Sequence, residues 1–219
     1  MVGQLTFTVG IRSGKCAGWL YDDDTVATAG HCVWNVYPED GPLGYVQNIV
    51  FKAGKNGDVE PYRSCVGYAA ATTAGWRDES RSDYDYGIVK IGCIIGLNVG
   101  TFGIDVVDDA TINNQTSQII GYSGDRVAEL KDGRHQLGSV GSIISYSPRS
   151  AYYNNDTGGG DSGGPVYRSR AGCQACAFGI HQGIEDATKN QGVRINTDVF
   201  NFLMLYRGNP PVYLPFVRK

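Results

Sequence analysis

The chain has 219 residues, of which 42% are hydrophobic and 19% are charged, and its formal net charge is -3. That length can bury a sizeable core in one domain or two small packed ones, and the composition excludes a disordered chain. The weak negative charge gives no electrostatic footprint for nucleic acid, and no apolar run reaches the roughly 18 residues of a membrane helix. We therefore expect a globular protein with no nucleic acid and no membrane as partner.

Short strand-like segments separated by glycine and polar turns follow one another along the chain. In order they read "QLTFTVGI", "QNIVFKAG", "YGIVKIG", "SQIIGY", "GSIISY", "GPVY" and "AFGIH". Their β-branched and aromatic residues favour strands. One helix is expected in "NTDVFNFLMLYRG", where Asn196 or Thr197 can cap residues at helical spacing. The sequence predicts an all-β fold with one closing helix, divided into an N-terminal half 1–105 and a C-terminal half 106–219.

The glycine-rich segment "NNDTGGGDSGGPVY" contains a single serine, Ser162. A serine hydroxyl becomes a nucleophile when a histidine removes its proton and a buried carboxylate orients that histidine. Of the three histidines, His31 follows a β-branched strand in "TVATAGHCV". Asp85 heads the apolar strand of "SDYDYGIVKI", whereas its rival Asp83 belongs to the preceding polar turn. The pattern predicts Ser162 as nucleophile, His31 as general base and Asp85 as the orienting carboxylate.

Six cysteines are present, and their spacing alone does not choose among the possible pairings: Cys16, Cys32, Cys65, Cys93, Cys173 and Cys176. One C-x-x-C pair occurs, but a structural zinc site needs four ligands, so we predict no metal. An even number of cysteines, with 31 glycines and 14 tyrosines, is typical of a secreted protein. We expect secretion, with the signal already removed, because "MVGQLTFTVGIRSG" lacks the features of a signal peptide.

Three segments in this order, "TAGHC", "DYGIVK" and "GDSGGPV", resemble the chymotrypsin-fold serine proteases. More narrowly, "CAGWLYDDDTVATAGHC", "AGWRDE", "DTGGGDSGGPVY" and "GIHQGIEDATKNQGVRINTDVF" resemble the glutamyl endopeptidases of the Bacillus type. The resemblance runs from about Cys16 to the closing helix. It implies two six-stranded antiparallel β-barrels with the triad between them, and protein or peptide substrates. We expect a monomer without a cofactor.

The resemblance also implies a disulfide between Cys16 and Cys32, and we expect Cys65–Cys93 and Cys173–Cys176 to complete the set.

The resemblance assigns further residues around the nucleophile. Backbone N–H groups of Gly160 and Ser162 would form the oxyanion hole, where a side chain at position 160 would hinder the backbone. His181 and Thr157 match the pair that holds a substrate carboxylate in glutamyl endopeptidases. An imidazole N–H and a hydroxyl can each donate to this acceptor-only group. Cleavage after glutamate, and less well after aspartate, is the implied activity.

Two other functions are open at this point. Asp156 lies where trypsin-like proteases carry the carboxylate that selects lysine or arginine, so cleavage after basic residues is one alternative. Glutamate is favoured because the Bacillus-type relatives carry Asp-Thr here as well, and because His181 would crowd a basic side chain. The other alternative is an inactive homologue that only binds.

Three features need a structural answer. Asp161 precedes the nucleophile, and as a buried carboxylate it requires an internal arginine, lysine or backbone donor. In several glutamyl endopeptidases the free amine of a longer leading segment helps to neutralise the bound glutamate, whereas the first predicted strand here begins close to Met1. The apolar tail "NPPVYLPFVRK" is expected to pack on the body of the molecule.

Overall fold

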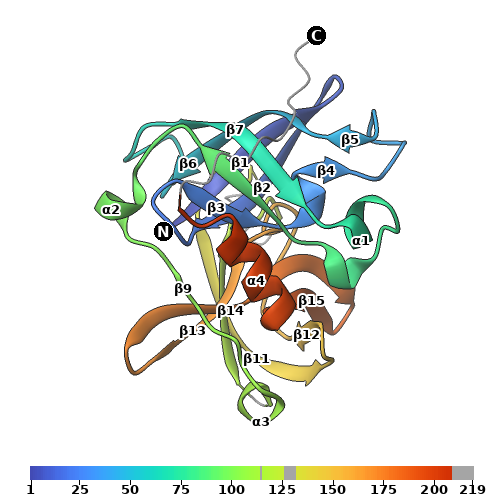
Figure 1. Ribbon diagram of the computed structural model, residues 1–219, viewed down its shortest axis with the longest axis vertical. Coiled ribbons are helices and arrows are strands. Elements are labelled where there is room, and N and C mark those ends of the chain that lie inside the picture. The colour runs from blue at the N-terminus through green and yellow to red at the C-terminus, as the bar shows by residue number, and fades with distance from the viewer. Residues whose placement is uncertain (114, 126–131, 209–219) are drawn as a thin grey trace.

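Two closed barrels of antiparallel strands stand one above the other in Figure 1. The computed structural model describes residues 1–113, 115–125 and 132–208, so the apolar tail lies outside the described residues. The first barrel has six strands, in the order β1 (Val2–Val9), β2 (Arg12–Leu20), β3 (Thr25–Thr28), β8 (Gly87–Ile91), β7 (Cys65–Thr72) and β6 (Gln47–Ala53).

The second barrel has the same strand number and closes through a pairing of its first and last strands. Its order is β13 (Pro165–Arg170), β10 (Thr116–Gly121), β11 (Leu137–Tyr146), β12 (Ser150–Tyr153), β15 (Lys189–Arg194) and β14 (Cys173–Asp186). A two-residue strand, β9 (Gly103–Ile104), adds to β14 in parallel. The smaller elements are β4 (Trp34–Asn35), β5 (Gly44–Tyr45), α1 (Ala74–Arg77), α2 (Gly96–Val99), α3 (Asp109–Ile112), η1 (Gly30–Cys32) and η2 (Ser82–Tyr84).

The closing helix α4 (Thr197–Leu205) is where the sequence predicts it. Its N-terminus is capped by Asn196, whose side-chain oxygen accepts a hydrogen bond from the N–H of Val199 at 3.1 Å. All seven predicted strand segments also fall on strands, which confirms the all-β fold. The last strand of the first barrel, β8, ends at Ile91, and β9, which begins at Gly103, pairs with β14 of the second barrel. The change from one barrel to the other therefore falls between these two strands. The boundary at residue 105 stays a prediction.

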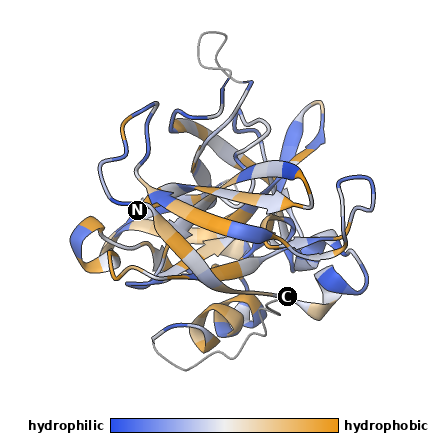
Figure 2. Cartoon of the chain, turned by 90° about the horizontal axis from the view of Figure 1, so that it is seen from above, coloured by the Kyte–Doolittle hydropathy of each residue, from blue (hydrophilic) through white to orange (hydrophobic). Residues whose placement is uncertain are grey.

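Hydrophobic residues fill each barrel and the seam between them, and Figure 2 shows them as orange stretches within strands whose connecting loops are largely blue. Leu5 and Phe51 belong to the core of the first barrel, and Phe178 to that of the second. The seam joins Trp19 of β2 to Leu203 of α4, both fully buried. The helix therefore packs into the core that the two barrels share.

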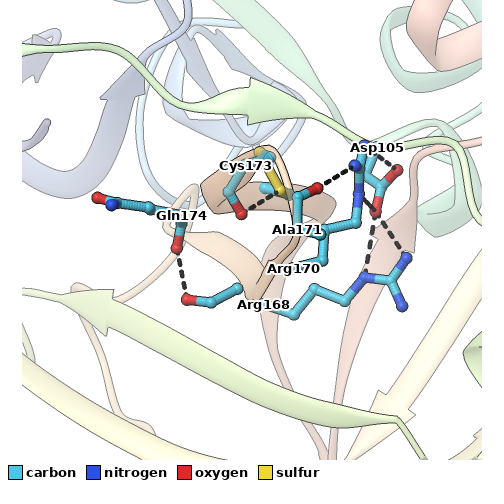
Figure 3. The surroundings of a disulfide bond; sticks show 8 residues. Asp105, Arg168, Arg170, Ala171, Cys173 and Gln174 are labelled. Atoms are coloured by element: carbon cyan, nitrogen blue, oxygen red, sulfur yellow. Dashed lines mark hydrogen bonds and ion pairs between the residues drawn. A yellow bond between two sulfur atoms is a disulfide. The ribbon is translucent and has the colours of Figure 1, made fainter.

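The three expected disulfides are all present: Cys16–Cys32, Cys65–Cys93 and Cys173–Cys176. Figure 3 shows the third of these beside a buried carboxylate, Asp105, which directly follows β9. Asp105 pairs with Arg168 at 2.7 Å and with Arg170 at 3.1 Å, while its backbone N–H donates to Ala177 at 2.8 Å. This ion-pair cluster fixes β9 to the second barrel.

Of the helices that the structure describes, not one has the length and apolar character to cross a membrane.

Candidate active site

His31 lies in the turn η1 that follows β3, at the rim of the first barrel. The Cys16–Cys32 disulfide ties this turn to β2. The preceding residue, Gly30, has no space for a side chain, because a Cβ there would lie 2.8 Å from the Thr72 hydroxyl oxygen and 2.9 Å from Oδ1 of Asp85. The glycine of "TAGHC" thus lets the carboxylate approach the histidine closely.

Asp85 binds His31 twice. Its Oδ2 lies 2.8 Å from Nδ1 of the imidazole, and its Oδ1 accepts the backbone N–H of the same residue at 2.7 Å. The Asp85 side chain is 5% exposed, whereas the imidazole is 25% exposed. Burial opposes protonation of His31, but the charge of Asp85 and its hydrogen bond outweigh burial, so the pKa of His31 is raised above its ordinary value. One carboxylate therefore fixes both the tautomer and the orientation of the ring.

The rival carboxylate Asp83 is engaged elsewhere. It pairs with Arg81 at 2.9 Å and with Arg149 at 3.5 Å, on the outside of the turn η2.

Ser162 lies on the loop between β12 and β13, close to the first barrel. Its carbonyl accepts the N–H of Ala17 at 2.8 Å, and its hydroxyl donates to the carbonyl of Gln182 at 2.9 Å. Gly163 has a φ of +83°, and a Cβ there would overlap the Thr28 hydroxyl and the carbonyl of Ala17. The glycine after the serine is thus required by the contact between the barrels.

Ser162 and His31 line one cleft of about 290 Å³, together with residues of the β1–β2 hairpin such as Phe7 and Lys15. His31 also lines a second cleft of about 420 Å³, which Asp85 and Trp76 share. His31 therefore borders both clefts, and Ser162 and Asp85 each line one of them.

Gly160 adopts a backbone conformation that L side chains rarely take up. Its φ is +105°, and a Cβ would collide with the carbonyl of Tyr122, so only glycine fits. Within residues 1–113, 115–125 and 132–208, no acceptor satisfies the N–H of Gly160 or of Ser162. Two backbone donors beside the Ser162 hydroxyl are thus available to a ligand.

Asp161 is fully buried, and one of its oxygens accepts the N–H of Gly158 at 3.0 Å. A backbone donor three residues earlier is therefore among its partners, as the sequence allowed.

The structure places His181 on β14 and Thr157 at the start of the nucleophile loop. His181 is 1% exposed, and its Nδ1 lies 2.7 Å from the hydroxyl of Tyr153. Thr157 donates to the side-chain oxygen of Asn190 at 2.5 Å. The amide orientation of Asn190 follows from its nitrogen, which donates to the carbonyl of Asn155 at 2.6 Å. The hydroxyl proton of Thr157 is therefore committed to Asn190 in the free protein.

Asp156 is exposed, and its backbone N–H donates to the hydroxyl of Ser139 at 2.8 Å.

Sequence reasoning missed Tyr153, Asn190 and Gln182, which contact the predicted site residues. Gln182 supplies the carbonyl for the Ser162 hydroxyl, and its side chain lies 3.4 Å from Asp85. Its position directly after His181 was the only available signal. Nothing in the sequence marks Tyr153 or Asn190, because their roles depend on strand register.

Among the residues that the structure describes, the one group of three potential ligands within reach of each other is Cys16, His31 and Cys32. Both sulfurs belong to a disulfide and offer no thiolate. This donor set does not fit a metal ion.

Comparison with known proteins shows the family to which the chain belongs. The trypsin family model matches residues 2–205. The chain is 31% identical over 202 residues to the glutamyl endopeptidase of Bacillus licheniformis, covering 90% of this chain and 60% of that protein. It is also 31% identical over 190 residues to the extracellular metalloprotease of Bacillus subtilis, covering 85% of this chain and 56% of that protein. The chain thus spans less than two thirds of either relative.

Solved structures show the same fold. A Glu endopeptidase in complex with MPD has a TM-score of 0.77 and 26% identity, covering 92% of this chain and 88% of that one. The protease Anisep from Arthrobacter nicotinovorans has a TM-score of 0.74 at 20% identity, covering 91% of this chain and 92% of that one. The fold is chymotrypsin-like, and the chain belongs to the trypsin family of serine proteases. Among the proteins it is similar to is a glutamyl endopeptidase.

Proposed function

We propose that this chain is a serine endopeptidase that cleaves peptide bonds after glutamate, and less well after aspartate. The observation that carries the proposal is the pair of hydrogen bonds that Asp85 accepts from His31, which shares a cleft with Ser162. The Asp85 contact keeps the proton of the neutral ring on Nδ1, so Nε2 is left to accept a proton.

In the proposed reaction Ser162 turns its hydroxyl from the carbonyl of Gln182 to Nε2 of His31. The serine oxygen attacks the substrate carbonyl as its proton passes to the ring, and His31 then returns that proton to the leaving amine. Water repeats these steps on the acyl-enzyme. The N–H groups of Gly160 and Ser162 stabilise the developing oxyanion, each contributing about 3 to 4 kcal/mol to the transition state.

The choice of glutamate rests on Thr157, at the start of the nucleophile loop, and on His181 of β14 beside that loop. The carbonyl of His181 accepts the N–H of Gly163 at 2.7 Å, which places β14 directly against the loop. Thr157 would release its proton from Asn190 and donate to the bound carboxylate. The exposure of Asp156 favours glutamate over a basic residue, because a carboxylate that selects lysine must face the pocket.

We also propose that the protein is secreted and acts on proteins and peptides. Three disulfides favour an oxidising compartment, and the relative from Bacillus subtilis is called extracellular.

A serine-directed fluorophosphonate probe tests the nucleophile. The parent should be labelled and Ser162→Ala should not, while Ser13→Ala, which changes a serine of the same cleft, should be labelled like the parent. Absence of labelling in the folded parent would leave a binding-only homologue.

Mass spectrometry tests the substrate preference by locating the cuts that this enzyme makes in a denatured protein. Cuts after lysine or arginine would transfer substrate selection to Asp156.

A further inference from the structure

The hydroxyl of Tyr153 and Nδ1 of His181 form a hydrogen bond of 2.7 Å in the interior of the second barrel. Tyr153 is 0% exposed and His181 is 1% exposed. No sequence motif connects these two residues, and neither the catalytic triad nor the oxyanion hole uses the tyrosine. A functional role for this hydrogen bond rests on the proposed function, because His181 is the residue proposed to bind the substrate carboxylate.

The contact is built by three adjacent strands. Tyr153 on β12 is paired with Asn190 of β15, and His181 on β14 is paired with Gly192 of the same middle strand. The tyrosine therefore reaches across β15 at Gly192. A Cβ at Gly192 would lie 2.7 Å from the Tyr153 hydroxyl and 2.8 Å from the carbonyl of Ile180. The absence of a side chain at Gly192 opens the path between the two rings.

The direction of the hydrogen bond follows from the donors and acceptors available. A phenol has one proton, and among the residues that the structure describes the contact with His181 is the one hydrogen bond that the Tyr153 hydroxyl makes. If Nδ1–H of His181 donated instead, the buried phenol proton would have no acceptor, which is costly. Tyr153 is therefore the donor and Nδ1 is the acceptor.

The protonation state of the phenol agrees with this direction. Burial, and then the negative charge of Asp161, raise the pKa of Tyr153 well above its ordinary value. The phenol keeps its proton at neutral and alkaline pH, so it remains a donor.

We propose that Tyr153 is a positioning residue for substrate selection, which holds His181 in the tautomer with its proton on Nε2. In that tautomer the ring edge directed away from Tyr153 is a hydrogen-bond donor. A donor there favours a carboxylate, whereas the opposite tautomer would present a lone pair and repel it. The neutral ring can therefore bind the acidic side chain without first becoming charged.

Nitrogen NMR of the imidazole rings tests the tautomer directly. The chain has three histidines, so His135→Gln and His181→Gln variants suffice to assign the signals. We expect His181 of the parent protein to carry its proton on Nε2 and to have an unprotonated Nδ1. Protonation of Nδ1 would overturn the proposal, and this measurement needs neither a variant at position 153 nor any cleavage.

Kinetics test the consequence, with Tyr153→Phe as the variant and Tyr152→Phe as its matched control. Tyr152 is the neighbouring residue of β12, and its ring faces Lys189. For a peptide with glutamate before the cut bond, Tyr153→Phe should reduce kcat/KM about tenfold, mainly through KM, as expected when a buried group loses its partner. The rate of inactivation by diisopropyl fluorophosphate, which has no acidic group, should stay the same.

The outcomes separate the two proposals. Equal losses in glutamate cleavage and in inactivation rate would mean that Tyr153 only supports the fold, and an unchanged kcat/KM would also refute its role. If the parent enzyme shows no preference for glutamate, the proposed function fails, while the NMR result still decides the tautomer.

Discussion

Replacement of Asp85 by asparagine isolates the role of the carboxylate at nearly constant shape. The two oxygens of Asp85 accept from Nδ1–H and from the backbone N–H of His31, at 2.8 and 2.7 Å. An amide has one acceptor oxygen and must present its NH2 group to one of these donors. The backbone cannot give up its proton, but the ring can change its tautomer. The amide nitrogen should therefore face Nδ1, which moves the ring proton to Nε2.

With its proton on Nε2, His31 cannot accept the proton of Ser162, and we expect Asp85→Asn to reduce kcat by about 10⁴-fold. The pH dependence of activity gives a second test of the role of Asp85. His31 acts as a base only when neutral, so activity falls as pH drops through its raised pKa. Removal of the Asp85 charge leaves burial to dominate, which lowers that pKa and moves the acid limb of residual activity to lower pH.

The assay measures kcat and kcat/KM over a pH series, with active-site titration and the melting temperature as checks on folding. Asp83→Asn is the matched control, because this carboxylate contacts Arg81 and Arg149 instead of the ring. It should leave kcat unchanged. A tenth or more of the parent activity in Asp85→Asn, or an equal loss in Asp83→Asn, would refute this role of Asp85.

Three further substitutions have defined outcomes. Gly160→Ala, at a φ of +105° and against the carbonyl of Tyr122, should displace the oxyanion donor and reduce kcat by about 10² to 10³-fold in a steady-state assay. Asp105→Asn should cost about 1 to 3 kcal/mol in urea unfolding at pH 7. Burial raises the pKa of Asp105, but its arginine partners outweigh burial and lower it, so this stabilisation is present above the ordinary pKa and is lost as pH falls through the folded-state value. A cost that did not shrink in acid would contradict that assignment. Thr157→Val should reduce kcat/KM for a glutamate peptide less than His181→Ala does, because the Thr157 hydroxyl must first break its hydrogen bond to Asn190. An equal or larger loss in Thr157→Val would show that Thr157 is the main donor.

The triad candidates could be predicted because each lies at a junction that short motifs mark. His31 follows β3, Asp85 precedes β8, and Ser162 lies in a glycine-rich loop. In each case the strand and turn residues around the side chain indicate where it will be placed. The all-β fold was equally accessible, since strand alternation and turn glycines are local features of the sequence.

Contacts that depend on the register between distant strands could not be predicted. The Tyr153–His181 contact requires β12, β15 and β14 to be adjacent, with Gly192 at the crossing point. The two residues of β9 are too few for any periodicity, and their pairing depends on the Asp105 cluster. The Gly158 donor to Asp161 depends on the backbone geometry of a turn, which composition alone does not determine.

The most direct test of the central claim is kcat/KM for matched quenched peptides that differ only in the residue before the cut bond. The series has glutamate, aspartate, glutamine, lysine, arginine, phenylalanine and leucine, with Ser162→Ala as blank. We expect the highest kcat/KM for glutamate, a lower value for aspartate, and loss of the preference in His181→Ala. Preferred cleavage after lysine or arginine, or a glutamate preference that survives in His181→Ala, would contradict the account.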